Sequence, residues 1–498
     1  MFFNQRAGQA KPAMWGESAK EAADIALATT RRRGASYGDV RIVTIRNQEI
    51  RAEDRRIERI SDSESCGIGV RVIADGAWGF AATSNVSPAA AEAVATSAVV
   101  VGRASASLRK GPPVLLAEEP PHRNRFATPR EKNPFEIAIE RKVEILLTAH
   151  DGILKVAGVK KAHSFLRFKR ETKTFANTEG SFLELDVLTS ACGLRATAIE
   201  GGDAQTRKYE PPTLNHGFEV VERADLLANA SRVGAEAVEK LRARPSPSEP
   251  MDLILLPSHL WLTVHESVGH TTELDRVLGM EESLSGGSFA TLDRLGQLRY
   301  GSPLIHFRAL NARPGLLAST GYDDDGVECQ DWDIVRDGIL VGYTTNREVA
   351  PAMGERRSRG SCRADSWASI PILRMPNLCL MPGRERISLE DLIADTRHAI
   401  LIEGDGSFSI DQKRVNFQFG GDAFWEIRDG KRVGMLRDVT YHGITPEFWN
   451  SCDAVCDERE WQPYGALNCG KGDPMQVAQM TTGSAPARFR GVQVRRAE

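Results

Sequence analysis

The chain has no long hydrophobic run. No window approaches the ~18 consecutive apolar residues of a membrane-spanning helix, so the sequence predicts no membrane association. The segment Met1–Arg6 also lacks an apolar core of signal-peptide length. We therefore expect no export by that route and a cytoplasmic location.

Cysteine and net charge are both scarce. The eight cysteines are irregularly spaced, which in a cytoplasmic chain indicates buried thiols or metal ligands rather than a disulfide framework. A formal net charge of −3 does not favour nucleic acid as a partner. The basic residues at 31–33 and 488–496 are expected to be solvated helix ends and a solvated tail.

Length and composition predict at least two domains. Single hydrophobic cores stop growing near ~250–300 residues, and this chain has 498 residues with an ordinary globular balance, 41% hydrophobic and 26% charged. The segment Pro245–Pro250 contains three prolines and is typical of a linker. We expect an N-terminal α+β domain at 1–247 and a C-terminal domain at 248–498.

The spacing of apolar residues predicts an α+β fold. In the first half, alternating runs such as Val40–Ile45 lie between helical segments, a pattern typical of an antiparallel sheet with helices. In the second half the signals are mostly β, and Asp337-Gly338 and Asp429-Gly430 have the sequence of tight hairpin turns. That half is expected to be a barrel-like or sandwich domain. Other expectations are a surface connection at 109–134 and helices at 222–244 and 388–397.

The most informative stretch is Val264–His270, which places two imidazoles and a carboxylate within six residues. In the zinc-peptidase pattern H-E-x-x-H the histidines are four apart on one helix face. Here His265 and His270 are five apart, about 140° around a regular helix. A π-bulge or a kink at Gly269 would bring both rings to one ion. We therefore predict an irregular helix that holds zinc.

The same stretch contains apolar positions that indicate its orientation. Trp261, Val264 and Val268 follow helical spacing and should pack inward. The two histidines and Glu266 are then expected on the remaining surface of the helix. Glu266 stands to one side of His265, where a base beside a metal would lie.

Two histidines do not complete a catalytic zinc site, which needs three protein ligands plus water. Cys469 is one candidate, because the neighbouring glycines keep its loop open and Lys471 would favour the thiolate. Cys452 and Cys456, four apart, could instead act as a pair and close a structural site. The remaining candidates are Cys329, Cys362, Cys379, His306 and His442.

Each motif also has a simpler interpretation. A His-Glu pair with another histidine nearby arises by chance in long chains, and a buried histidine is commonly just hydrogen-bonded. The run Asp323–Asp325 does not match the alternating ligands of a calcium loop and is expected to be a solvated turn. Gly404–Gly406 and Gly420–Asp422 do not match a phosphate-binding loop, so turns are expected there too.

A family resemblance rests on two of these motifs together. The run His265–His270, with Cys469-Gly470-Lys471 near the chain end, resembles the modulator-of-gyrase (TldD/PmbA) zinc metalloprotease family. The segment Gly67–Val72 followed by Gly79–Ala81 is similar to the N-terminal sheet of that family. The likeness covers nearly the whole chain, while residues 481–490 depart from the bacterial pattern.

The resemblance implies a site and a partner. By it, His265, His270 and Cys469 bind zinc and Glu266 is the catalytic base. Members of the family often pair with a TldE/PmbA-like subunit that lacks the motif, so this chain is similar to the catalytic partner. A homodimer or such a heterodimer is therefore expected.

The expected function is zinc-dependent cleavage of peptides or unfolded chains. Glu266 would take a proton from the attacking water and deliver it to the leaving amine. Two other classes of function use the same residues: a non-catalytic zinc-containing scaffold or binding subunit, and a metal-dependent hydrolase of non-peptide amides. Counting the protein ligands in a metal-bound structure distinguishes the scaffold from the peptidase. Comparing the hydrolysis of peptides with that of small amides distinguishes the amidohydrolase from the peptidase.

Overall fold

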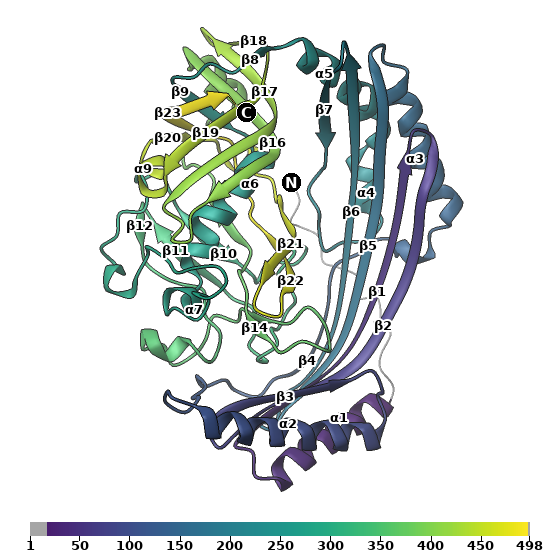
Figure 1. Cartoon of the computed structure of the whole chain (residues 1–498), viewed down its shortest axis with the longest axis vertical. Helices are drawn as coiled ribbons and strands as arrows, with labels where there is room; N and C mark the ends of the chain where they lie inside the picture. Colours follow the sequence, from purple (N-terminus) through teal and green to yellow (C-terminus); the bar gives the residue numbers. More distant parts are fainter. Residues whose placement is uncertain (1–16, 497–498) are drawn as a thin grey trace.

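The computed structural model describes residues 17–496 (Figure 1). The expectation for Met1–Arg6 falls outside that range. Within it, no helix combines the length and the apolar character that crossing a membrane requires. The predicted α+β architecture is confirmed, with an antiparallel sheet and helices in the first half and a β-rich second half that contains a closed barrel.

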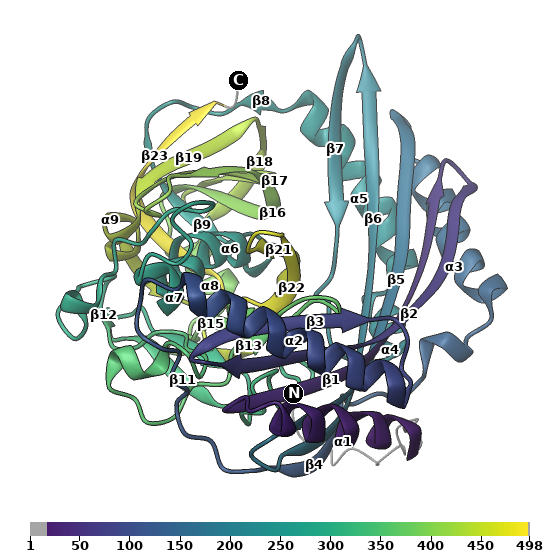
Figure 2. The same cartoon turned by 60° about the horizontal axis from the view of Figure 1, so that its bottom comes forward.

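One seven-stranded sheet organises the N-terminal half. Its order is β3-β2-β1-β5-β6-β4, with β7 also paired to β6. The long strands form a curved wall beside the second half, and α1 and α2 cover one end of it while α3 and α5 pack on the other (Figures 1 and 2). The elements are α1 (Glu17–Arg32), β1 (Tyr37–Glu53), β2 (Arg56–Ala74), β3 (Ala77–Thr83), α2 (Pro88–Leu108), β4 (Arg123–Ala127), α3 (Ile139–Leu154), β5 (Val159–Asn177), β6 (Phe182–Glu200), β7 (Asp203–Tyr209), α4 (Glu219–Ala224) and α5 (Leu226–Arg242).

Two expectations for this half need correction. The connection at 109–134, expected to run over the surface outside the main elements, contributes Arg123–Ala127 to the sheet as β4, which pairs in parallel with β6. The helix expected at 222–244 is two helices that meet at Asp225. Asp225 has a left-handed backbone (φ 44°), and its side chain accepts a hydrogen bond from Ala228 N. The same residue therefore ends α4 and caps the start of α5.

The C-terminal half contains a five-stranded barrel. Strands follow the order β16-β9-β23-β19-β17, and β16 also pairs with β17, which closes the ring. The barrel carries β18, β8 and β20 as further strands, and a four-stranded sheet, β12-β11-β10-β15, lies beside it. The elements are β8 (Arg244–Pro245), β9 (Pro250–Leu255), α6 (Pro257–Val264), α7 (Leu274–Val277), β10 (Phe307–Leu310), β11 (Asp331–Arg336), β12 (Ile339–Leu340), β13 (Cys362–Arg363), β14 (Ile372–Leu373), β15 (Leu378–Leu380), α8 (Leu389–Ala394), β16 (His398–Ile410), β17 (Asn416–Arg428), β18 (Lys431–Arg437), β19 (Val439–Ile444), α9 (Thr445–Asn450), β20 (Cys452–Val455), β21 (Gly465–Lys471), β22 (Gln476–Thr481) and β23 (Ala487–Arg496).

Local turn chemistry was predicted correctly in this half. Asp337-Gly338 and Asp429-Gly430 join β11 to β12 and β17 to β18, and all four residues have positive φ. The helix expected at 388–397 is present as the shorter α8, which begins with a Ser388–Asp391 capping box. The division of the chain at 247/248 stays a prediction.

Other expectations for the second half were wrong. The glycines at 404–406 and 420–422 lie inside β16 and β17, not in turns, and Asp405 pairs with Gly421. A Cβ on Gly406 would lie 2.6 Å from the Gly421 carbonyl oxygen, so these glycines permit close strand packing. The basic tail is the barrel strand β23, in which Arg488 is buried and paired with Asp395 and Asp453.

The largest correction concerns Asp323–Asp325, which is buried where the two halves meet. The three residues are 2%, 1% and 2% exposed. Arg71 of β2 lies 2.7 Å from Asp325, and Lys173 of β5 lies 2.7 Å from Asp324. The long sheet thus presents buried cations that need anions, and this turn supplies them. A solvated turn was the wrong expectation because its partners lie far away in the sequence.

Candidate metal centre

The helix that carries the histidines changes pitch at the predicted place. Helix α6 continues as a π-turn over His265–Gly269 and then as a 3₁₀ turn over His270–Thr272. The His270 N–H donates to the His265 carbonyl, five residues back. A π-turn holds one residue more than an α-turn, so histidines five apart come to the same side. The predicted irregular helix is confirmed.

Hydroxyl groups satisfy the carbonyls that the wider turn frees. The Ser267 carbonyl accepts from Thr271 Oγ1 (2.9 Å) and from the Tyr300 hydroxyl (2.5 Å), and the Val268 carbonyl accepts from Thr272 Oγ1 (2.9 Å). Buried carbonyls without such partners would be costly. Sequence reasoning missed these residues, although two adjacent threonines directly after His270 are a signal, because threonine hydroxyls can bond the carbonyl four residues back.

Gly269 is needed for close packing. A Cβ at this position would lie 2.3 Å from Met375 Sδ, a contact that real side chains do not make. The glycine therefore lets the π-turn approach the segment between β14 and β15. The proposed kink is replaced by the π-turn, and the glycine has a packing role instead.

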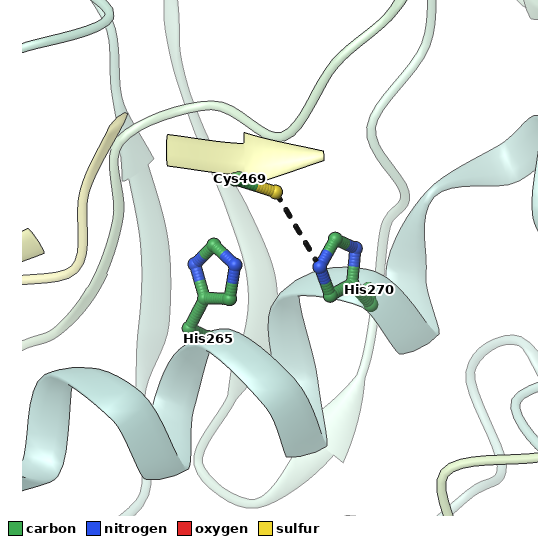
Figure 3. A group of neighbouring side chains, drawn as sticks. All are labelled: His265, His270 and Cys469. Carbon is green, nitrogen blue, oxygen red and sulfur yellow. Dashed lines mark hydrogen bonds between the residues drawn. The ribbon is translucent and has the colours of Figure 1, made fainter. Parts of the chain in front are cut away.

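The structure brings three of the predicted residues together. His265, His270 and Cys469 are all buried, and their ligand atoms lie within 4.8 Å of one another. Figure 3 shows both rings pointing from the helix toward the strand β21 that carries Cys469. Cys469 Sγ lies 3.5 Å from His270 Nε2, and the two imidazole planes are 85° apart. Sequence reasoning expected the histidines and Glu266 on a surface, so their burial corrects that expectation.

The pKa shifts of Cys469 and His265 favour the thiolate and the neutral imidazole, which are the protonation states that bind metals. Burial alone would raise the pKa of Cys469, but His270 and Arg374 outweigh it, and the pKa of the thiol falls below its ordinary value. Burial lowers the pKa of His265, which leaves a neutral imidazole with a free lone pair. Burial instead raises the pKa of Cys329 to about 11 and those of Cys379, Cys452 and Cys456 to about 12. Cys469 is thus the thiol most readily present as thiolate among these candidates.

The geometry and donor set fit zinc. Tetrahedral zinc with its usual Zn–N and Zn–S bonds places a nitrogen and a sulfur ligand about 3.5 Å apart, and Cys469 Sγ and His270 Nε2 are 3.5 Å apart. Figure 3 shows Nε2 of His265 on the side of its ring toward His270, and Nδ1, which is buried without a hydrogen-bond partner among residues 17–496, on the other side. Two imidazoles and a thiolate are ligands that zinc prefers. In the described part of the chain the cluster has three members, and Cys452 and Cys456 are not among them.

Glu266 lies at the edge of the cluster. It is 7% exposed, and its Oε2 accepts a 2.6 Å hydrogen bond from Arg414 Nη1. Burial would raise the pKa of Glu266, but His270, His265 and Arg414 hold it below its ordinary value, so the carboxylate is ionised and able to accept a proton. Arg414 comes from the β16–β17 turn, 148 residues away, and no feature of the sequence indicated this contact.

The remaining ligand candidates lie in other environments. His306 pairs with Asp333 through a 3.0 Å contact, and His442 lines a pocket of about 450 Å³ together with Arg490 and Gln493. The Cys362 thiol lies 3.9 Å from Arg71 Nη1 at the junction of the two halves. The structure therefore brings only Cys469 to the histidine pair among the candidates described.

Comparisons with known proteins point in one direction. Models of the PmbA/TldA metallopeptidase match along the chain: domain 1 at residues 38–100, the central domain at 132–244 and the C-terminal domain at 248–496. A metalloprotease of Methanothermobacter thermautotrophicus is 27% identical over 92% of this chain and 95% of its own length. A protein of Saccharolobus solfataricus named zinc metalloprotease TldD homolog is 23% identical over 85% of this chain and 89% of its own.

Solved structures share the fold. A Thermotoga maritima protein crystallised as a candidate modulator of a DNA gyrase superposes with a TM-score of 0.76 at 16% identity, covering 96% of this chain and all of that one. TldE from Thermococcus kodakarensis gives a TM-score of 0.72 at 17% identity, again covering 96% of this chain and all of that one. At these identities the likeness establishes the fold alone.

Proposed function

The chain belongs to the PmbA/TldD metallopeptidase family, and on that premise we propose that it is a zinc-dependent peptidase that cleaves peptides or unfolded chains. The observation that carries the proposal is the buried cluster of His265, His270 and Cys469 beside an ionised Glu266. Zinc appears in the name of one relative, and the donor set of this chain is consistent with it.

His265, His270 and Cys469 are the proposed ligands. A zinc ion held by three protein groups would supply an acidified water and polarise a substrate carbonyl. The protein's part is to present these three donors from two rigid elements, the π-turn and β21. Their burial keeps bulk water out of the site, which strengthens every electrostatic interaction there.

Glu266 is the proposed general base. Its carboxylate would take a proton from the attacking water and deliver it to the leaving amine. Arg414 holds this carboxylate through the 2.6 Å contact to Oε2, which leaves Oε1 for the water. A base must lie within ~3 Å of the proton that it takes, so fixing the carboxylate direction is the contribution of Arg414.

The proposed partner is a second subunit of the same family, either another copy or a TldE/PmbA-like chain. The fold shared with TldE is compatible with such pairing. Light scattering on the purified protein, alone and mixed with a candidate subunit, checks this directly. A mass of one chain under all conditions would contradict it.

The function is tested by digesting an unbiased peptide library with and without a zinc chelator. We expect cleavage that stops with chelator and returns with added zinc. Glu266→Gln should retain zinc and lose cleavage by about 10²–10⁴-fold, the usual contribution of a general base. Cleavage that ignores chelator, or full activity of the Gln variant, would contradict the proposal.

Two alternatives predict other outcomes of the same experiment. A non-catalytic zinc-containing scaffold or binding subunit would bind zinc and cleave nothing. A metal-dependent amidohydrolase would hydrolyse small amides and spare peptides.

A further inference from the structure

A carboxylate lies directly behind one proposed zinc ligand. Glu273 is fully buried, and its Oε2 lies 2.8 Å from His270 Nδ1. Carboxylate oxygens accept hydrogen bonds, so this contact favours the tautomer of His270 with its proton on Nδ1. The lone pair of His270 is then on Nε2, the atom that faces Cys469 Sγ at 3.5 Å.

A buried lysine connects this carboxylate to the cysteine strand. Lys471 is 1% exposed, and its Nζ lies 3.1 Å from Glu273 Oε1 and 2.9 Å from Asp275 Oδ1. Lys471 follows Cys469 by two residues on β21. Side chains two apart in a strand point to the same side, so Lys471 and Cys469 face the segment 265–275 together.

The two contacts join parts of the site that are distant in the sequence. The hydrogen bond from Lys471 to Glu273 spans 198 residues, and the Cys469–His270 contact spans 199. The Cys469 carbonyl accepts from Arg374, so β21 is held on a second side as well. A shift of β21 by one residue would turn Cys469 and Lys471 away from the histidines at the same time.

Stability alone does not account for this arrangement. Burying an ammonium and two carboxylates costs desolvation energy that their attraction only partly recovers. What such a network supplies instead is a defined geometry between the groups it connects. Here the groups are the histidine ring and the cysteine strand.

We propose that Glu273 and Lys471 are a positioning pair for the metal centre, in which Glu273 fixes the tautomer and direction of His270 and Lys471 holds the Cys469 strand against it. The inference rests on the zinc site of the proposed function and extends it to two residues that do not touch the metal. Groups that orient metal ligands in this way typically contribute about 10–100-fold to metal affinity.

The test compares Lys471→Met and Glu273→Gln with a matched control, Lys173→Met. Lys173 is also a buried lysine paired with a buried carboxylate, Asp324, at 2.7 Å, but it contacts none of the proposed ligands. Zinc affinity is measured on the full chain by competition with a chromogenic chelator, and the cobalt-substituted protein is examined by its thiolate-to-metal absorption band.

The pair should change the metal site, whereas the control should change stability alone. Lys471→Met is expected to weaken zinc binding about 10–100-fold and to shift or weaken the cobalt–thiolate band. Glu273→Gln keeps an acceptor oxygen for His270 and should therefore weaken zinc binding less than Lys471→Met does. Lys173→Met should lower Tm, with wild-type zinc affinity and cobalt spectrum.

Several outcomes decide the matter. Unchanged zinc affinity and cobalt spectrum in both variants would overturn the positioning role and leave the pair as an ordinary buried network. If Lys471→Met does not fold, Glu273→Gln carries the test by the same two readouts. A wild type that binds no zinc would sink the proposed function and this inference together. If the wild type binds zinc and the two variants show the predicted losses of zinc affinity, but the wild type cleaves no peptide, the proposed peptidase function is contradicted and the positioning role is retained.

Discussion

The Asp323–Asp325 turn and the centre formed by His265, His270 and Cys469 are both buried clusters of metal-ligand residue types, and they differ in the partners that the protein supplies to them. In the Asp323–Asp325 turn all six carboxylate oxygens have partners: Arg71 and Arg347 N on Asp325, Lys173 and Ala364 N on Asp324, and three backbone N–H groups on Asp323. In the centre around His265, the buried Nδ1 of that residue has no partner within residues 17–496.

The difference distinguishes a structural cluster from the proposed metal site. A buried polar atom without a hydrogen bond costs free energy, and the acidic turn avoids that cost through its own partners. Each carboxylate oxygen of the acidic turn has a partner within the protein, and its ion pairs with Arg71 and Lys173 join the two halves. The histidine centre instead brings two imidazoles together with a thiol of lowered pKa.

Removing a ligand gives the largest expected effect. His265→Ala should weaken zinc binding by about 10³-fold or more, because the free energy of zinc binding is distributed over only three protein ligands. The measurement is chelator competition on the purified variant. If the His265→Ala variant still binds stoichiometric zinc with wild-type affinity, His265 is not a ligand and the proposed difference between the two clusters is wrong.

Removing a cation from the acidic turn should affect stability and spare zinc. Arg71→Met leaves Asp39 and Asp325 buried without their guanidinium, and breaking a buried pair typically costs about 3–5 kcal/mol. Urea unfolding should show that loss, while metal analysis still finds one zinc per chain. Loss of zinc in this variant would show that the two clusters are not separate.

Two other buried histidines, His150 and His259, have all their ring nitrogens hydrogen-bonded, and they predict a pH dependence of the free energy of unfolding. Both ring nitrogens of His150 and of His259 have partners, and burial lowers each pKa to about 4. Because these folded-state pKa values are depressed, the unfolded chain takes up protons first as the pH falls below ~6.5.

Stability should therefore be highest above pH ~6.5 and fall between pH ~6.5 and ~4, by up to ~1.4 kcal/mol per pH unit for each histidine. Urea unfolding at a series of pH values measures the slope. His150→Gln should flatten it, because this variant has no imidazole at that position to protonate. An unchanged slope in this variant would contradict the assignment.

A smaller effect is expected from crowding the π-turn. Gly269→Ala places a methyl group 2.3 Å from Met375 Sδ, and overpacking of this kind costs about 1–3 kcal/mol. Gly269→Ala should therefore lower both Tm and zinc affinity. The second substitution Met375→Ala makes room for the methyl group and should recover part of the lost zinc affinity. A single variant with wild-type Tm and zinc affinity would show that the close approach is unimportant.

Local sequence signals predicted what depends on neighbouring residues. The Asp-Gly hairpin turns need only a positive φ that those residues tolerate, and the irregular helix follows from the spacing of His265 and His270. The position of Cys469 was one candidate among several, because nothing in the sequence shows which distant thiol meets the histidines.

Features set by tertiary contacts could not be predicted. The burial of Asp323–Asp325 depends on Arg71 and Lys173, which lie on strands far away in the sequence. The contact of Glu266 with Arg414 and that of Glu273 with Lys471 are of the same kind. Asp225 was expected inside one helix because the sequence pattern around it is helical, whereas its left-handed backbone divides the segment into α4 and α5.

The most direct measurement is anomalous scattering at the zinc edge from crystals of the zinc-loaded protein. The proposed site predicts a single peak about 2.0–2.3 Å from a nitrogen of His265, Nε2 of His270 and Sγ of Cys469. It also predicts a fourth position not filled by the protein. A peak at the Asp323–Asp325 turn, a fourth protein ligand, or no peak at the histidine centre would contradict it.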